Sequence, residues 1–227
     1  MTETLAPSPG TDSRFAGRSV AEVAATLPGA TAVFRRRKLD FCCGGQAKLA
    51  EAAAAQGLPL AEIEAELAAL ATGATAPPQD TDALIELIET RYHATHRREL
   101  PELIRLAGRV ETVHRNHPDA PHGLAHLLKE MAEELESHMA KEEQVLFPLM
   151  RRGGHPMIAH PIGAMRAEHD SHDAQLLRLE ALTRDGAIPH GACATWRALY
   201  VGTRKLAEDL TAHIHLENTV LFPRFGG

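Results

Sequence analysis

The clearest pattern in the chain is a stripe of mainly apolar positions that recur alternately three and four residues apart. Over residues 122–150 the stripe runs through Leu124, Leu128, Met131, Leu135, His138, Glu142, Val145 and Leu149. Residues at this spacing lie on one face of an α-helix. Related stripes predict further helices over 82–116, 158–184 and 192–224. Four long helices with short, proline-containing connections predict an antiparallel bundle over 80–227.

The N-terminal third of the chain has a different organisation. Residues 1–18 are rich in Pro, Ser, Gly and Thr, and they predict a disordered lead-in. Short helix-forming stretches follow over 19–27, 30–37, 46–56 and 60–71. They predict a small helical domain over 19–72 that contains the adjacent Cys42 and Cys43. Residues 73–79 contain a glycine and two prolines and predict a linker to the bundle.

Composition narrows the class of protein. Aromatic residues make up only 4% of the chain while Ala, Leu and Glu are plentiful, which favours an all-α fold. The net charge of −6 offers no basic face for nucleic acid. No apolar run approaches the roughly 20 residues that cross a bilayer, and residues 1–10 do not resemble a signal peptide. Three cysteines, two of them adjacent, suit free thiols in a reducing compartment, so we expect a cytoplasmic protein.

Polar residues interrupt the apolar stripes in the same way in two of the helices. Residues 138–148 and a second stretch nearer the C-terminus both read His-x-x-x-Glu-x-x-Val-Leu-Phe-Pro. A His and a Glu four residues apart on a helix point the same way. A buried carboxylate is unfavourable without a counter-charge or a metal. The pairs His138/Glu142 and His213/Glu217 therefore predict a metal site more readily than a metal-free polar network.

Helix lengths predict which other histidines reach the level of these pairs. Counting residues from the turns places His169 at this level. In the first helix, His93 and His96 fit the stripe equally well, so the pattern does not choose between them. His114 lies about 31 Å from His93 along a straight helix and is a lesser candidate. Imidazole and carboxylate ligands inside a bundle favour iron, with manganese second and zinc less suited.

Several motifs together resemble the hemerythrin-like superfamily. The closest resemblance is to the iron-sulfur cluster repair di-iron proteins, or repair of iron centres family, which carry an ScdA-type N-terminal domain. The resemblance covers about residues 19–225. The motifs that carry it are Leu39–Gly45, Arg91–Leu103, Ser137–Glu143, Glu168–Asp170 and His213–Pro223.

This resemblance implies a hemerythrin-like four-helix bundle with two iron ions bridged by carboxylates and an oxo group. It selects His93 over His96 as the ligand from the first helix. The implied bridging carboxylates are Glu142 and Glu217. The full ligand set that it implies is His93, His138, Glu142, His169, His213 and Glu217.

The function implied by the resemblance is the repair of iron-sulfur clusters after nitrosative or oxidative stress, by donation of iron. Iron-sulfur proteins would be the targets, nitric oxide or oxygen the small ligands, and a homodimer the assembly. Reduction of nitric oxide at the di-ferrous site and a gas or redox sensor remain as alternatives. The oxygen-carrying hemerythrins differ, because the third helix here offers His172 at i+3 rather than i+4. That difference argues against oxygen carriage.

Cys42 and Cys43 are candidates for redox chemistry or iron transfer. They precede two glycines that leave the backbone amides exposed. A helix beginning near Gln46 would lower the pKa of a nearby thiol and raise its reactivity. The alternative is a buried turn in which both thiols are small apolar groups.

Glu134 and Glu168 are candidates for a route to the metal. The resemblance implies that small molecules or protons pass acidic side chains near the iron, and Glu168 directly precedes His169. The alternative is that both carboxylates are ordinary solvated side chains.

Overall fold

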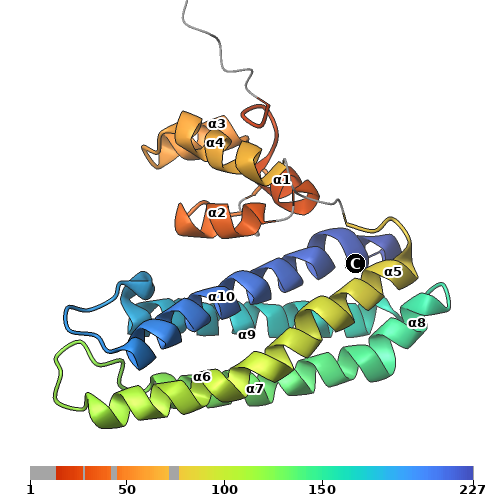
Figure 1. Cartoon of the computed structure of the whole chain (residues 1–227). Coiled ribbons are helices and arrows are strands. Elements are labelled where there is room, and N and C mark those ends of the chain that lie inside the picture. The colour runs from red at the N-terminus through yellow and green to blue at the C-terminus, as the bar shows by residue number, and fades with distance from the viewer. Residues whose placement is uncertain (1–13, 28, 42–44, 72–76, 227) are drawn as a thin grey trace, which may run out of the picture. The chain divides into compact units, whose positions relative to one another are not determined.

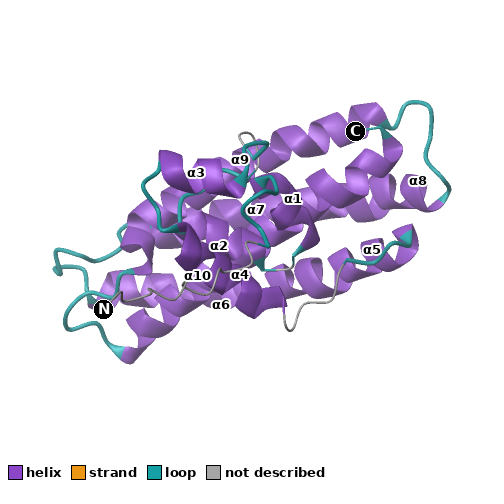
Figure 2. Cartoon of the chain, turned by 90° about the horizontal axis from the view of Figure 1, so that it is seen from above, coloured by secondary structure: helices purple, strands orange, loops and turns teal. Residues whose placement is uncertain are grey.

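The computed structural model describes residues 14–27, 29–41, 45–71 and 77–226. Helices and loops make up this part of the chain, which holds no strand (Figure 2). The predicted all-α class is therefore confirmed. None of the described helices is long and apolar enough to cross a membrane. The chain separates into two compact units that divide between Pro77 and Pro78.

Short helices form the N-terminal unit around an apolar core. They are α1 (Val20–Thr26), α2 (Ala30–Arg36), α3 (Leu49–Ala55) and α4 (Leu60–Ala71) (Figure 1). The Ser19 hydroxyl accepts a hydrogen bond from the N–H of Glu22 and caps α1. Buried side chains from all four helices, among them Val20, Phe34, Leu49 and Ile63, form the core.

The predicted lead-in over residues 1–18 is too long at its C-terminal end. Phe15 is buried in the core of the N-terminal unit. The N–H groups of Phe15 and Ala16 both donate to the carboxylate of Glu64. Burying an aromatic ring and pairing two amides fixes this segment in place. Residues 1–13 lie outside the described part of the chain.

Helix α3 begins at Leu49 and not near Gln46. Ser19 and Lys48 form an isolated antiparallel bridge, which holds Lys48 in an extended conformation. The helix therefore begins farther along the chain from the two thiols than predicted. Cys42 and Cys43 lie outside the described residues, and their chemical role stays a prediction.

Gly45 stands where no side chain fits. A Cβ atom there would lie 2.5 Å from the carbonyl oxygen of Phe41 and 2.9 Å from Cβ of Ala21. Because a backbone oxygen cannot rotate away, we expect Gly45→Ala to lower the free energy of unfolding of this unit by about 1–3 kcal/mol. Gly17→Ala is the control, because no neighbouring atom of the described residues would lie within 4 Å of its Cβ. Denaturant unfolding of the full chain measures both, and equal midpoints would contradict the prediction.

Four long helical runs form the C-terminal unit. The contacts of α6 with α7 and α10, and of α9 with α7 and α10, close them into a ring, as expected for the predicted antiparallel bundle (Figure 1). The four runs are α5 (Thr81–Leu87), η1 (Ile88–His93) and α6 (Ala94–Val113); α7 (Leu124–Lys141), η2 (Glu142–Leu146) and α8 (Phe147–Arg151); α9 (Ala159–Thr183); and α10 (Ala194–Leu216), η4 (Glu217–Leu221) and η5 (Phe222–Phe225).

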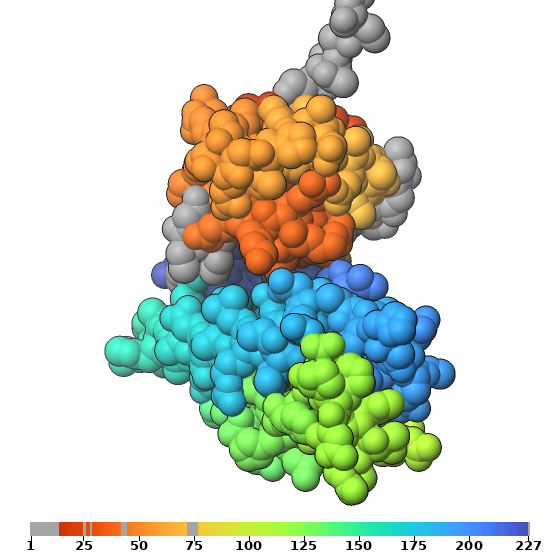
Figure 3. Space-filling view, turned by 90° about the vertical axis from the view of Figure 1, so that its left-hand side faces the viewer, coloured from red at the N-terminus to blue at the C-terminus, as the bar shows by residue number. Residues whose placement is uncertain are grey.

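The connections of the bundle meet at its two ends. Figure 3 shows one end, where the turn between α6 and α7 lies beside the connection from α9 to α10. An ion pair between Arg184 and Asp119 joins these two connections. Helix α6 passes through Pro101 without reversing direction. His93 and the turn after α6 therefore lie far apart along one rod.

Three of the long runs contain a π-helical segment at the level of the predicted ligands. His93 ends η1, Glu142 begins η2 and Glu217 begins η4. A π turn inserts an extra residue into a helix and is frequent at functional sites. In two cases a proline follows, Pro148 after η2 and Pro223 after η4. Because proline lacks an N–H, it leaves a carbonyl one turn earlier without its α-helical partner.

Candidate metal centre

Six buried side chains from the four long runs converge in the interior of the bundle. Each is at most 1% exposed, so none is hydrated at the surface. One apolar cluster lies on each side of this layer along the helices. The six residues are His93, His138, Glu142, His169, His213 and Glu217.

The four histidines form two facing pairs. Nε2 of His93 lies 3.1 Å from Nε2 of His213. Nε2 of His138 lies 3.1 Å from Nε2 of His169. Each pair joins two helices, and the ring nitrogens that face inward are those available for a metal ion.

The two glutamates lie between the histidine pairs. Each directs one carboxylate oxygen to one pair and its other oxygen to the second pair. Two groups of four potential ligands therefore share both glutamates. The separations are 3.4 Å for Glu142 Oε2 to His93 Nε2, 3.4 Å for Glu142 Oε1 to His138 Nε2, 3.1 Å for Glu217 Oε1 to His213 Nε2 and 3.1 Å for Glu217 Oε2 to His169 Nε2.

Hydrogen bonds on the outer side of two rings fix where their protons are. Nδ1 of His138 donates to Oε2 of Glu168 at 3.0 Å. Nδ1 of His169 donates to Oδ1 of Asn218 at 3.0 Å. With the proton on Nδ1, both inward Nε2 atoms present lone pairs to each other at 3.1 Å. A cation between them removes that repulsion, so this pair fits a metal ion.

The outer contacts of the other pair are less complete. Nδ1 of His93 donates to Oε1 of Glu143 at 2.7 Å, and Arg97 holds the same carboxylate. Nδ1 of His213 has no hydrogen-bond partner among the described residues. The ring of Tyr92 stacks on the His213 imidazole instead, with the centroids 5.5 Å apart.

Burial keeps His93 and His138 neutral, as ligands must be. It lowers the pKa of His93 to about 4 and that of His138 to about 3. Burial, and next the charge of Glu217, raise the pKa of Glu142 well above its usual range. Neither oxygen of Glu142 has a hydrogen-bond partner among the described residues. A metal cation supplies the missing positive charge, and the imidazole and carboxylate donors suit iron better than zinc.

Two further histidines are buried near the centre without joining it. The ring of His96 lies 5.5 Å from that of His213, and the ring of His172 lies 5.2 Å from that of His138. Neither belongs to the groups whose ligand atoms lie close together. The structure therefore brings His93 rather than His96 to the centre.

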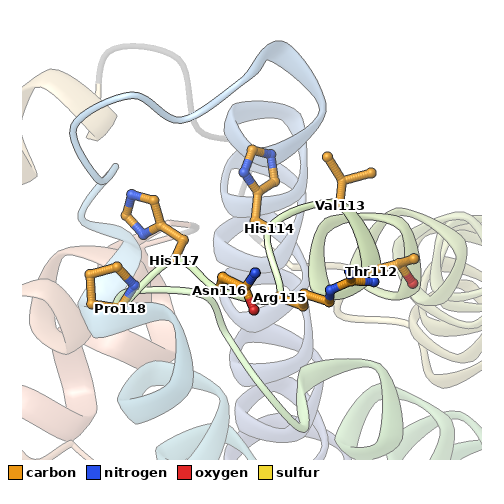
Figure 4. Close-up of a pocket in the computed structure, with 7 residues that line it drawn as sticks. All are labelled: Thr112, Val113, His114, Arg115, Asn116, His117 and Pro118. Carbon is orange, nitrogen blue, oxygen red and sulfur yellow. The ribbon is translucent and has the colours of Figure 1, made fainter.

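His114 is not brought to the centre. It ends α6 and lies in a pocket of about 570 Å³ with His117, beside the start of α10 (Figure 4). Its Nε2 lies 3.2 Å from Sγ of Cys193, and its ring packs against Trp196. This agrees with its placement as the lesser candidate, because α6 continues straight past Pro101.

Glu134 and Glu168 line a common cavity of about 390 Å³. Glu168 also contacts Lys141 at 2.6 Å, and its pKa is lowered by Lys141 and His138 although burial alone would raise it. Glu134 accepts a hydrogen bond from Gln175 at 2.8 Å. The remaining lining residues are Glu133, Ser137, Lys141, Ser171 and His172.

Sequence reasoning missed the residues that orient the ligands. Glu143 and Asn218 each directly follow a shared glutamate, and each accepts from Nδ1 of a histidine on another helix. The repeated motif offered a signal, because these residues occupy the same position in both copies. Arg97, which binds the carboxylates of Glu136 and Glu143, gave no such signal.

Comparison with known proteins agrees with this geometry. The family model described as the Hemerythrin HHE cation binding domain matches residues 84–225. The model ScdA_N, described as a domain of unknown function, matches residues 16–71. A hemerythrin domain implies iron, and the buried histidine and glutamate groups can hold it.

Curated relatives match nearly the whole chain. Proteins called "Iron-sulfur cluster repair protein YtfE" from Yersinia pseudotuberculosis serotype O:1b (strain IP 31758) and Yersinia pestis (strain Pestoides F) are both 45% identical to it over 214 residues. Each alignment covers 92% of this chain and 97% of the relative. The chain therefore belongs to the hemerythrin-like family of iron-sulfur cluster repair proteins.

Proposed function

We propose that this protein repairs iron-sulfur clusters damaged by nitrosative or oxidative stress, and that it does so by donating iron. The observation that supports this best is the pair of four-residue groups that share Glu142 and Glu217. In this proposal each group holds one iron ion, and the two glutamates bridge them. The 45% identity to relatives called repair proteins supports the same function.

The protein's own residues hold the iron in a form that can be given up. Four imidazoles and two carboxylates would hold two ferrous ions and would leave a net charge of about +2 at the centre. The apolar clusters on both sides keep bulk water from the metal. Bound iron supplies the metal that a damaged cluster has lost. Imidazole and carboxylate ligands bind iron less tightly than cluster sulfides and thiolates do, which favours transfer to the target.

The proposal also assigns a role to the acidic cavity beside the centre, as a route for iron to and from the surface. Glu168 contacts the ligand His138 on one side and lines the cavity on the other. Glu134 lines the same cavity. We propose that these carboxylates guide ferrous ions, and that the charge of Lys141 prevents them from holding the ions permanently.

Further parts of the proposal concern partners and location. Damaged iron-sulfur proteins are the targets, and nitric oxide and oxygen are the small ligands of the centre. Cys42 and Cys43 assist iron transfer or electron supply. The protein acts in the cytoplasm as a homodimer.

Anaerobic repair of a damaged enzyme tests the proposal. We expect the iron-loaded protein to reactivate a nitrosylated or apo iron-sulfur enzyme faster than ferrous salt does at the same iron concentration. Donation from a bound site avoids the loss of free iron to side reactions. The variant His138→Ala/Glu217→Ala, which breaks both ligand groups, should fall to the rate of ferrous salt. Equal rates for the iron-loaded protein and the salt would contradict the proposal.

A further inference from the structure

The interior of the bundle has an internal two-fold pattern. The run through α6 corresponds to α9, and the run through α7 corresponds to that through α10. His93 then corresponds to His169, and the residue after each shared glutamate, Glu143 or Asn218, binds Nδ1 of that histidine at 2.7 or 3.0 Å. The two metal positions therefore match in the way that His93 and His169 are oriented.

The pattern is broken at the residue before each of these histidines. Glu168 precedes His169 and accepts from Nδ1 of His138 at 3.0 Å. Tyr92 occupies the corresponding position before His93. The two-fold pattern predicts that this residue accepts from Nδ1 of His213. Its ring lies parallel to that of His213, at an interplanar angle of 8°, and offers no acceptor to the ring edge. Nδ1 of His213 accordingly has no hydrogen-bond partner in the described part of the chain.

This difference determines which histidine pair can form a hydrogen bond between its inward Nε2 atoms when no metal is bound. His138 and His169 both carry their protons on Nδ1, so their Nε2 lone pairs oppose each other until a cation lies between them. His213 can carry its one proton on Nε2, where an oxygen of Glu217 and Nε2 of His93 lie 3.1 Å away as acceptors.

Metal binding is therefore less favourable at His213 than at the other three histidines. To bind through Nε2, His213 must move its proton to Nδ1, which is buried and to which no described residue offers an acceptor. The loss of such a partner typically lowers metal affinity by about 10–100-fold. We propose that the metal position of His93 and His213 releases its iron first, and that Glu168 and Tyr92 set this order. The inference rests on the two-iron centre proposed above.

Capture of iron by an excess of a ferrous chelator tests the order directly. The fully loaded, anaerobic protein should release two irons per chain in two phases of equal amplitude. We expect the first phase to be at least about tenfold faster than the second. Because loss of the first iron also removes a bridged neighbour, two phases alone do not assign the positions, and variants are needed.

Glu168→Ala assigns the slow phase. It removes the acceptor from His138, so the slow phase should accelerate about 10–100-fold while the fast phase keeps its rate. Glu168→Gln, whose amide oxygen still accepts from Nδ1 as that of Asn218 does, should retain most of the slow rate. Glu133→Ala is the matched control, because it removes a carboxylate from the same cavity and Glu133 is not one of the six ligands.

Tyr92→Glu assigns the fast phase. It places a carboxylate where Glu168 stands in the other half, and it should slow the fast phase about tenfold. Tyr92→Phe keeps the stacked ring and adds no acceptor, so it should leave both rates unchanged.

The outcomes separate the inference from the function beneath it. A parent protein that carries fewer than two irons per chain overturns the two-iron centre, and the order with it. Two irons that leave the parent protein in a single phase, or a Glu168→Ala protein that accelerates the fast phase or neither, overturn the order alone. The Glu168 series decides the matter even if Tyr92→Glu does not fold.

Discussion

The double variant His138→Ala/Glu217→Ala is expected to lose nearly all of the iron that the parent protein carries. Each substitution removes an inward ligand, and Glu217 directs an oxygen to both histidine pairs. One group keeps three potential ligands and the other keeps two. Because loss of even an orienting partner typically weakens metal binding by about 10–100-fold, loss of ligands from both groups should leave affinities too low to survive purification.

Metal analysis of protein purified without added metal measures this effect. We expect about two irons per chain in the parent and close to none in the variant. The surface pair His126/Glu130 provides a matched control, since it has the same residue types and spacing on α7 and a contact of 3.2 Å. His126→Ala/Glu130→Ala should retain the parent iron content. Tightly bound zinc in the parent, or full iron in the double variant, would show that the assigned metal or ligand set is wrong.

Much of this centre could be predicted from the sequence because its pattern is redundant. The His-x-x-x-Glu motif occurs twice at positions that the apolar stripe assigns to the buried face. Helix length alone then places His169 level with both copies. The structure brings all of these residues together. The same counting placed His114 far from the centre, as observed.

The choice between His93 and His96 shows what an apolar stripe cannot decide. Both side chains are buried, so both satisfy the stripe. The π-helical segment over Ile88–His93 changes the helical phase at this point, and a regular period of 3.6 residues does not describe it. The family resemblance, which compares residue identities rather than periods, selected His93.

The outer partners of the ligands depend on contacts between helices. The bond from His93 to Glu143 joins the first and second long runs, and that from His169 to Asn218 joins the third and fourth. A pattern along one helix carries no information about rotation against its neighbour. The ordered segment around Phe15 was missed for a similar reason. A composition rich in Pro, Ser and Gly predicts disorder and does not reveal that one phenylalanine ring packs into the core.

The metal-free protein is expected to lose stability sharply in mild acid. Burial is the first cause that lowers the pKa of His93 to about 4, of His96 to about 2 and of His138 to about 3. In the unfolded chain these rings take up protons near pH 6.5. Between pH 6.5 and about 4, the unfolded state therefore binds more protons than the folded state, and stability falls as the pH falls.

This loss is a substantial part of the stability of a typical domain. At pH 5 each of the three histidines lowers the free energy of unfolding by about 2 kcal/mol. The raised pKa of Glu142 acts in the opposite direction, because the folded state gains a proton there as the pH falls. Between pH 7 and 5, one carboxyl that is protonated only in the folded state returns at most about 2.6 kcal/mol, somewhat more than one histidine costs. A net loss of about 3 kcal/mol compares with a typical total of about 5–15 kcal/mol.

Chemical unfolding of the metal-free protein at pH 7, 6 and 5, followed by its helical signal, measures the loss. His96→Leu tests its origin, because His96 is buried but does not belong to the ligand groups. This variant should remove about a third of the histidine contribution, since one of three proton-binding sites is gone. The exposed His126→Leu should leave the pH dependence as it is.

Iron-loaded protein should resist the same acid until the metal leaves, because bound metal stabilises the folded state alone. A pH-independent stability in the metal-free protein would mean that water reaches these rings, and that the dry interior on which the metal centre depends is not maintained without iron.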